Sequence, residues 1–191
     1  MSAAALIEAA AAGELPAWAE AGPRRRAHMA RVARLMDAWA AQLGLDEAER
    51  MRWRAAAWLH DALRDADPER LRAMLDSDRP EWPAGLLHGP ATAARLEAEG
   101  VRDEALLRAV AWHTIGHPEM DRLGHALYIA DYIEPGRTYE PERLAVLRAR
   151  MPAALDAVLR EVAERRIGHL LRSGRALAPE SVAFWNRLTG A

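Results

Sequence analysis

The sequence contains no cysteine and no lysine, and each absence excludes a group of chemistries. Without cysteine, the chain has no disulfide, no thiolate metal site, no iron–sulfur cluster and no cysteine nucleophile. Without lysine, it has no Schiff base and no Walker A lysine, and all 26 basic residues are arginine, a bias typical of GC-rich coding sequence. The formal charge of −2 argues against a dedicated nucleic-acid-binding protein.

Aromatic residues and long apolar runs are also scarce. Aromatics make up 6% of the chain, whereas alanine supplies close to half of the 51% hydrophobic fraction. An alanine–leucine core favours close helix packing over a sheet. No run approaches the roughly 18 apolar residues of a membrane span, and the first residues, MSAAALIEAAAAGELP, lack the positive region of a signal peptide. We therefore expect a cytoplasmic protein that binds no membrane.

Apolar residues recur at helical spacing along almost the whole chain, and no stretch alternates with period two. Proline, glycine and capping residues divide this pattern into segments. We expect helices over 2–12, 23–44, 46–61, 68–75, 89–99, 103–113, 121–133, 141–174 (with a bend allowed at Pro152) and after Pro179, and a loop over 76–83. The sequence therefore predicts an all-α protein, with one helical-bundle domain over 21–191 and a helical extension over 1–20.

Histidine and aspartate occupy the positions where chemistry is expected. His60 and Asp61 are adjacent, so their side chains project about 100° apart on a helix and can still hold one ion between them. His28 lies on an apolar helix face and Asp131 lies in an apolar run, where an unpaired polar group would be costly. Each of these residues alone is more often a satisfied core or surface residue. Buried imidazoles together with buried carboxylates are best explained by a cation between them.

The order of six such residues resembles the HD-domain metal-dependent phosphohydrolases: His28, His60-Asp61, His88, His113 and Asp131. Longer motifs resemble the YqeK-type branch of that family, the symmetrical diadenosine tetraphosphate hydrolases of bacteria. These motifs are LHGP at 87–90, HTIG at 113–116, IADYIEPGR at 129–137 and FWNRL at 184–188. The resemblance covers about residues 20–190, and the second and third motifs together are its most specific part.

The resemblance implies two divalent or trivalent metal ions, with iron expected and manganese as the alternative. It implies that the first ion is held by His28, His60, Asp61 and Asp131, and the second by His88 and His113, with Asp61 bridging. Four imidazoles and two carboxylates suit such metals, and they exceed the ligands of a structural zinc site. A metal lowers the pKa of bound water to about 7, which supplies hydroxide near neutral pH. The resemblance further implies symmetrical cleavage of diadenosine tetraphosphate to two ADP.

Arginines supply further candidates near this centre. The resemblance implies that Arg137 meets a phosphate, because a guanidinium fork fits phosphate oxygens. The alternative for Arg137 is a salt bridge with Glu134 or Glu140. Arg25 is expected to contact substrate, with a solvated basic helix start as the alternative. Catalytic roles are expected for Asp61, Arg64 and Arg137.

Two positions depart from the family pattern. Arg64 stands where the family commonly has lysine, so the charge is kept but a planar fork replaces a point charge. His117 stands where the family usually has arginine, and only its protonated form would attract phosphate. In the same loop, Thr114 is expected to donate a hydrogen bond to substrate and Gly116 to let the backbone approach it. The alternative for both is an ordinary turn.

Other readings of the chain stay open at this stage. They are a hydrolase of another nucleotide, a non-catalytic metal-binding regulatory HD module, and a purely structural helical protein. Trp82 is a candidate for stacking on adenine, with anchoring of its loop as the alternative, and His125 and His169 are expected to be structural. The expected partner is a small dinucleoside polyphosphate rather than nucleic acid, and the alanine-rich helices could support a homodimer.

Overall fold

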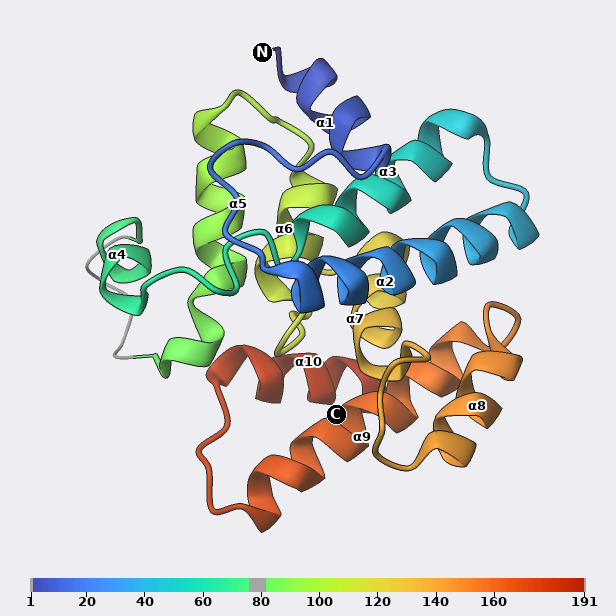
Figure 1. The fold of residues 1–191 in the computed structure, drawn as a ribbon. Coiled ribbons are helices and arrows are strands. Elements are labelled where there is room, and N and C mark those ends of the chain that lie inside the picture. Colours follow the sequence, from blue (N-terminus) through green and yellow to red (C-terminus); the bar gives the residue numbers. More distant parts are fainter. Residues whose placement is uncertain (1, 76–81, 191) are drawn as a thin grey trace.

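Helices make up the regular structure in the computed structural model, which describes residues 2–75 and 82–190. The α-helices in these ranges are α1 (Ala3–Ala11), α2 (Pro23–Gln42), α3 (Glu47–Leu59), α4 (Pro68–Ala73), α5 (His88–Ala98), α6 (Glu104–Trp112), α7 (Arg122–Ile133), α8 (Pro141–Arg150), α9 (Leu155–Arg172) and α10 (Pro179–Thr189), and η1 (Ala84–Leu86) is a short 3-10 helix (Figure 1). The described residues form no strand, which confirms the all-α prediction. None of the described helices is long and apolar enough to cross a membrane.

Local signals set most helix starts. A capping aspartate side chain accepts a hydrogen bond from the first turn of α3, α4, α6 and α7. Proline occupies the first turn of α2, α4, α8 and α10, where its missing N–H costs nothing. These signals are visible in the sequence, so most expected boundaries agree with the structure within a few residues.

The prediction of one helix over 141–174 is wrong. The chain leaves the helix at Met151, passes through a cis peptide bond to Pro152 and starts α9 at Leu155. Proline has no N–H for the helix ladder, and its ring clashes with the preceding turn. α9 then packs against α8, and Glu161 of α9 accepts hydrogen bonds from Arg143 (Nε to Oε1, 3.1 Å) and Arg150 (Nη1 to Oε2, 2.8 Å). Of the predicted loop over 76–83, residues 76–81 lie outside the described residues.

Small side chains let the central helices approach one another closely. Ala55, Ala56 and Ala57 of α3 are all fully buried, where α3 packs against α2 on one side and α1, α6 and α7 on others (Figure 1). Leu6 and Ala10 of α1 belong to the same apolar core. At the opposite side of the bundle α9 packs on α7 and α10 packs on α9, and the Phe184 ring of α10 meets the Tyr128 ring of α7 with 5.4 Å between centroids. This packing brings α2, α7 and the ends of α3 and α6 together.

Candidate metal centre

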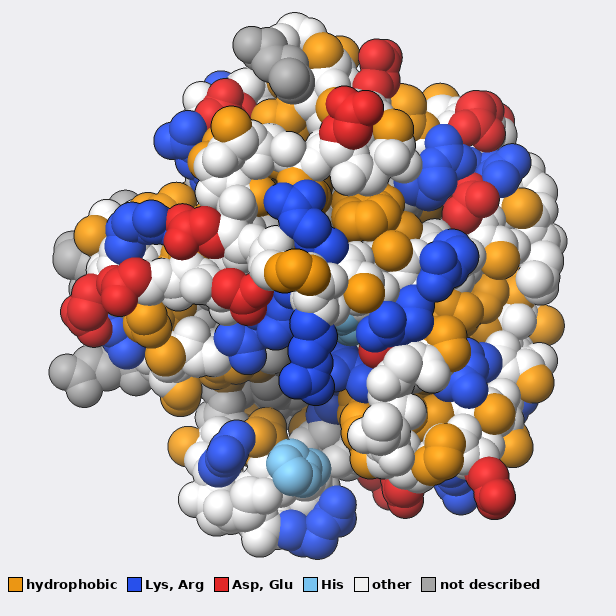
Figure 2. Space-filling view, in the orientation of Figure 1, with side chains coloured by type: hydrophobic (Ala, Val, Ile, Leu, Met, Phe, Trp, Pro, Cys, Tyr) orange, Lys and Arg blue, Asp and Glu red, His pale blue; other side chains and the backbone are white. Residues whose placement is uncertain are grey.

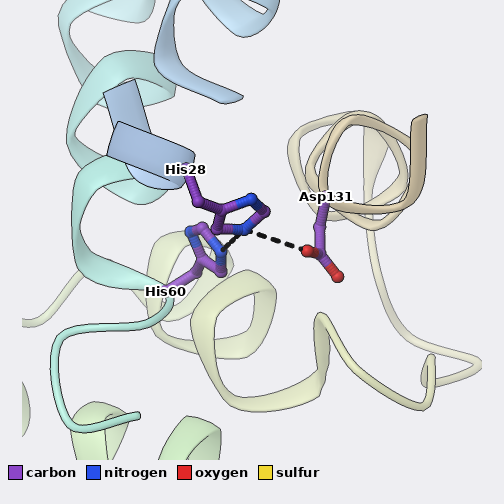
Figure 3. A group of neighbouring side chains, drawn as sticks. All are labelled: His28, His60 and Asp131. Atoms are coloured by element: carbon purple, nitrogen blue, oxygen red, sulfur yellow. Dashed lines mark hydrogen bonds and ion pairs between the residues drawn. The ribbon is translucent and has the colours of Figure 1, made fainter. Parts of the chain in front are cut away.

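Six side chains converge where α2, α3, α5, α6 and α7 meet. They are His28 in α2, His60 and Asp61 at the end of α3, His88 at the start of α5, His113 at the end of α6, and Asp131 in α7. All six are buried, and His60 is fully so. Figure 3 shows three of them, from three different helices, with their polar atoms turned toward one another. The structure therefore brings together every residue that the sequence nominates as a metal ligand.

The first part of the cluster contains His28, His60 and Asp131. The Nε2 atom of His28 lies 3.3 Å from Nε2 of His60 and 3.2 Å from Oδ1 of Asp131. Nitrogen and oxygen ligands lie about 2.1 Å from a transition metal, so neighbouring ligands at right angles are about 3 Å apart. These three atoms are spaced as ligands of a single ion would be.

Asp61 connects this group to a second pair of imidazoles. Its Oδ1 atom lies 3.1 Å from Nε2 of His88 and 3.6 Å from Nε2 of His113, and those two nitrogens are 3.1 Å apart. Its other oxygen, Oδ2, lies 3.7 Å from Nε2 of His28 and 3.6 Å from Nε2 of His60. One carboxylate therefore presents one oxygen to each pair of imidazoles, which is the arrangement that a bridging ligand needs.

Hydrogen bonds to the far side of the rings fix which nitrogen carries the lone pair. Nδ1 of His60 donates to the Ala57 carbonyl oxygen, and Nδ1 of His113 donates to the Val110 carbonyl oxygen, both at 2.8 Å. In the neutral rings the Nε2 atoms therefore carry lone pairs, and these lone pairs point into the cluster. Converging lone pairs repel one another unless a proton or a metal ion lies between them.

Three members of the cluster are held in the protonation states that bind metal. Burial alone would raise the pKa of Asp61, but the surrounding imidazoles hold it well below its usual range. Burial would likewise raise the pKa of Asp131, but His28 and Arg166 hold that pKa well below its usual range. Burial lowers the pKa of His60 to about 3, so that ring is neutral. Ionised carboxylates and neutral imidazoles are the forms that bind metal.

His28 differs from His60 because two carboxylates form hydrogen bonds with its ring. Burial would lower its pKa, but hydrogen bonds with Asp131 and Glu134 raise the pKa to about 9. A metal ion bound at Nε2 must displace the proton that this ring holds in the metal-free protein.

The free energy of unfolding of the metal-free chain should therefore fall as the pH rises from 6.5 to about 9. The folded state holds the His28 proton more tightly than the unfolded state, so its contribution is complete below pH 6.5 and is lost as the pH passes through the folded pKa. The slope should reach at most about 1.4 kcal/mol per pH unit. Urea unfolding of EDTA-treated protein measures it, and an unchanged slope in His28→Gln would show that another group is responsible.

Arg25 and Arg137 both reach carboxylates of the cluster. Nη1 of Arg25 donates to Oδ2 of Asp61 at 2.6 Å, so Arg25 is not simply part of a solvated helix start. Nη2 of Arg137 donates to Oδ1 of Asp131 at 2.7 Å, and its Nε lies 3.7 Å from Glu134. Glu140, the other alternative partner, pairs with Arg165 instead.

A cavity of about 1380 Å³ opens beside the cluster. Arg64, Thr114, Asp131 and Arg137 contribute to its wall nearest the cluster, and Trp82 lines it as well. Figure 2 shows arginine side chains gathered around the hollow in the middle of this face. Among the lining residues, six guanidinium groups against two carboxylates leave a net charge of +4. A cavity of this size and charge suits a large polyanion.

The remaining candidates in the loop after α6 have packing partners. Gly116 has φ of +78°, and an added Cβ would lie 2.2 Å from the Phe184 ring, so a side chain there would collide with α10. His117 stacks on Trp112 with 4.9 Å between ring centroids. Neither residue is in the cavity wall, whereas Thr114 is, and its Oγ1 lies 3.1 Å from Nε2 of His113.

Trp82 both anchors its loop against apolar residues and borders the cavity, where it was a candidate for stacking on adenine. It is 7% exposed in a small apolar cluster and meets Trp112 edge-on, with 5.7 Å between ring centroids. Its remaining surface lines the cavity.

Two contacts of the cluster were missed on sequence alone. Glu134 is 2% exposed, accepts hydrogen bonds from Arg31 and from the Gly136 N–H (2.6 Å), and lies 3.2 Å from Nδ1 of His28. It therefore orients the His28 ring. Its place in the IADYIEPGR motif is the sequence signal that could have identified it. Arg166 of α9 pairs with Oδ2 of Asp131 at 2.8 Å, and no motif marks it.

Comparisons with known proteins agree with this geometry. A protein named "Bis(5'-nucleosyl)-tetraphosphatase, symmetrical" from Halalkalibacterium halodurans is 28% identical over 147 residues, covering 74% of this chain and 78% of that protein. Proteins of the same name from Staphylococcus aureus and Bacillus subtilis are 35% identical over 99 residues (51% of each chain) and 29% identical over 141 residues (70% of this chain and 74% of that protein).

A solved structure and a family profile add to these relatives. The crystal structure of a predicted HD superfamily hydrolase involved in NAD metabolism, from Clostridium acetobutylicum, superposes with a TM-score of 0.77 at 27% identity and covers 88% of this chain and 90% of that one. The HD domain profile matches residues 25–136, which is more than half of the chain. The chain therefore belongs to the HD domain family.

Proposed function

We propose that this chain is a metal-dependent symmetrical bis(5'-nucleosyl)-tetraphosphatase that hydrolyses diadenosine tetraphosphate to two ADP. Three curated relatives at 28%, 35% and 29% identity carry that name. The observation that carries the proposal is the position of Asp61, whose two oxygens each face a separate pair of histidines. This arrangement supports two ions side by side rather than one.

The donor set fits iron or manganese. It consists of four imidazoles and two carboxylates, and the chain has no thiolate to favour a softer metal. We assign His28, His60 and Asp131 to one ion, His88 and His113 to the other, and Asp61 to both. Bound ions would polarise a phosphoryl oxygen and lower the pKa of a water molecule. We take iron as the expected metal, because the resemblance of the sequence implies it.

The chain's own side chains would bind and orient the polyphosphate. The Arg137 side chain is 32% exposed, lines the cavity and also holds Asp131, so it can contact a phosphate beside the cluster. Arg64 lines the same wall. A guanidinium fork binds two phosphate oxygens at once and fixes their orientation. Arg25 and Glu134 act behind the reacting groups, since Arg25 holds Asp61 and Glu134 holds the His28 ring.

The cavity favours a dinucleotide over a mononucleotide. Small-molecule sites usually enclose about 300–1,000 Å³, and this cavity of about 1380 Å³ is larger. Its net charge of +4 also suits a bridge of four phosphates better than a single phosphate. These observations favour a dinucleoside tetraphosphate over the alternative of another, smaller nucleotide.

Product analysis tests the proposed activity. The iron- or manganese-loaded chain should convert diadenosine tetraphosphate to ADP alone, as measured by chromatography. Production of ATP and AMP in equal amounts would show asymmetric cleavage and contradict the proposal. Tight metal binding without turnover of any nucleotide in a panel would instead favour the regulatory alternative.

A further inference from the structure

One face of α9 forms a basic wall of the cavity that extends away from the metal centre. Arg165, His169 and Arg172 line the cavity at positions i, i+4 and i+7, which fall on one stripe of a helix. Arg175 continues this wall in the segment that follows α9. At 1.5 Å per residue, the stripe from Arg165 to Arg172 is about 10 Å long. The wall therefore reaches well beyond the contact between Arg166 and Asp131.

Among the described residues, no acidic side chain pairs with the charges in the outer part of this wall. Close to the cluster, Arg165 pairs with Glu140 and Arg166 pairs with Asp131. Farther out, Arg172 and Arg175 are exposed and form no ion pair with any residue that the structure describes. Neighbouring like charges repel one another, so this part of the wall would bind an anion favourably.

Apolar side chains stand next to these charges. Leu170 and Leu177 line the same part of the cavity, alongside His169. Arginines with neighbouring leucines offer phosphate oxygens a partner and a nucleoside an apolar surface. A bare inorganic anion would leave that apolar surface unused.

We propose that His169, Arg172, Arg175, Leu170 and Leu177 form a second nucleotide subsite, which binds one nucleoside diphosphate half of the substrate. We call these five residues the outer subsite. The other half would occupy the Trp82 and Arg64 side of the cavity. The inference rests on the proposed function for the identity of the ligand, and it adds that one chain holds both halves of the dinucleotide at the same time.

Binding of ADP to the full metal-loaded chain tests the outer subsite. Isothermal titration should find two ADP molecules per chain for the wild type and one for the double variant R172Q/R175Q. The same variant should raise the KM for diadenosine tetraphosphate by about tenfold, with kcat within about twofold, because the reacting centre is unchanged. The matched control R122Q/R187Q removes two exposed arginines outside the cavity wall and should keep both ADP sites.

The two proposals fail in different ways. A wild-type chain that produces two ADP from diadenosine tetraphosphate but binds a single ADP would overturn the outer subsite alone. Two ADP sites of unchanged affinity in R172Q/R175Q would overturn it as well. Failure of the proposed function would appear as no release of ADP from diadenosine tetraphosphate by the metal-loaded wild type.

Discussion

Asp61→Ala should abolish hydrolysis of diadenosine tetraphosphate and remove metal from the purified chain. Asp61 is the carboxylate that His88 and His113 face among the described residues, and its other oxygen faces His28 and His60. Without it, the two pairs of imidazoles would have no charged ligand in common, and His88 and His113 would have none among the described residues. A loss of about 4 kcal/mol of transition-state stabilisation corresponds to a rate reduction of about a thousandfold. Steady-state kinetics and elemental analysis of the same preparation measure both effects.

Two controls separate this result from general damage to the fold. Asp156→Asn removes an exposed carboxylate of α9, and His125→Ala removes a histidine outside the cluster that packs near Phe184. Both variants should keep their metal and nearly all of their activity. Full metal content and near-normal turnover in Asp61→Ala would rule out a bridging role for this residue.

Gly89→Ala should destabilise the fold and weaken metal binding together. An added Cβ would lie 2.6 Å from the Ala111 carbonyl oxygen and 2.9 Å from the Val110 carbonyl oxygen, so α5 would have to move away from α6. The Val110 carbonyl also accepts the hydrogen bond from His113 Nδ1, and His88 precedes Gly89 directly. We expect a loss of about 1–3 kcal/mol in the free energy of unfolding and a loss of about 10–100-fold in metal affinity.

Gly124→Ala is the matched control for this substitution. The three atoms nearest to its added Cβ all belong to the Met120 side chain, at 3.0–3.1 Å, so a shift of a few tenths of an ångström would relieve this contact, whereas Gly89 faces backbone at 2.6 Å. Urea unfolding and metal titration should therefore show a change below about 1 kcal/mol and unaltered metal affinity for this variant. Equal effects of Gly89→Ala and Gly124→Ala would contradict a special role for the close contact between α5 and α6.

Much of the helical pattern could be predicted because its signals are local. Capping aspartates such as Asp46 and first-turn prolines such as Pro23 act within four residues of the position they determine. Local signals of this kind do not distinguish a break at Pro152 from a bend. It depends on α8 packing against α9, including the ion pair of Arg150 with Glu161, and this contact exists only in the folded chain.

The candidate metal ligands could be predicted from burial costs and from the resemblance of longer motifs, rather than from local helix signals. The costs of burying His28 and Asp131 indicate a cation, but their convergence with His88 rests on the resemblance of longer motifs, since spacing along the chain does not fix distance in space. His169 is a residue whose position at the cavity the sequence does not indicate. It matches no motif and was expected to be structural, yet it is exposed and lines the cavity, because the packing of α9 on α7 decides which face of the helix borders the cavity.

Anomalous diffraction from crystals of the active, iron-loaded chain would locate the metal ions themselves. We expect two iron peaks, one beside His28, His60 and Asp131 and one beside His88 and His113, with Asp61 in contact with both. A single peak, or none at these side chains in crystals of enzyme that still hydrolyses diadenosine tetraphosphate, would contradict the assignment of the six residues to a two-metal centre.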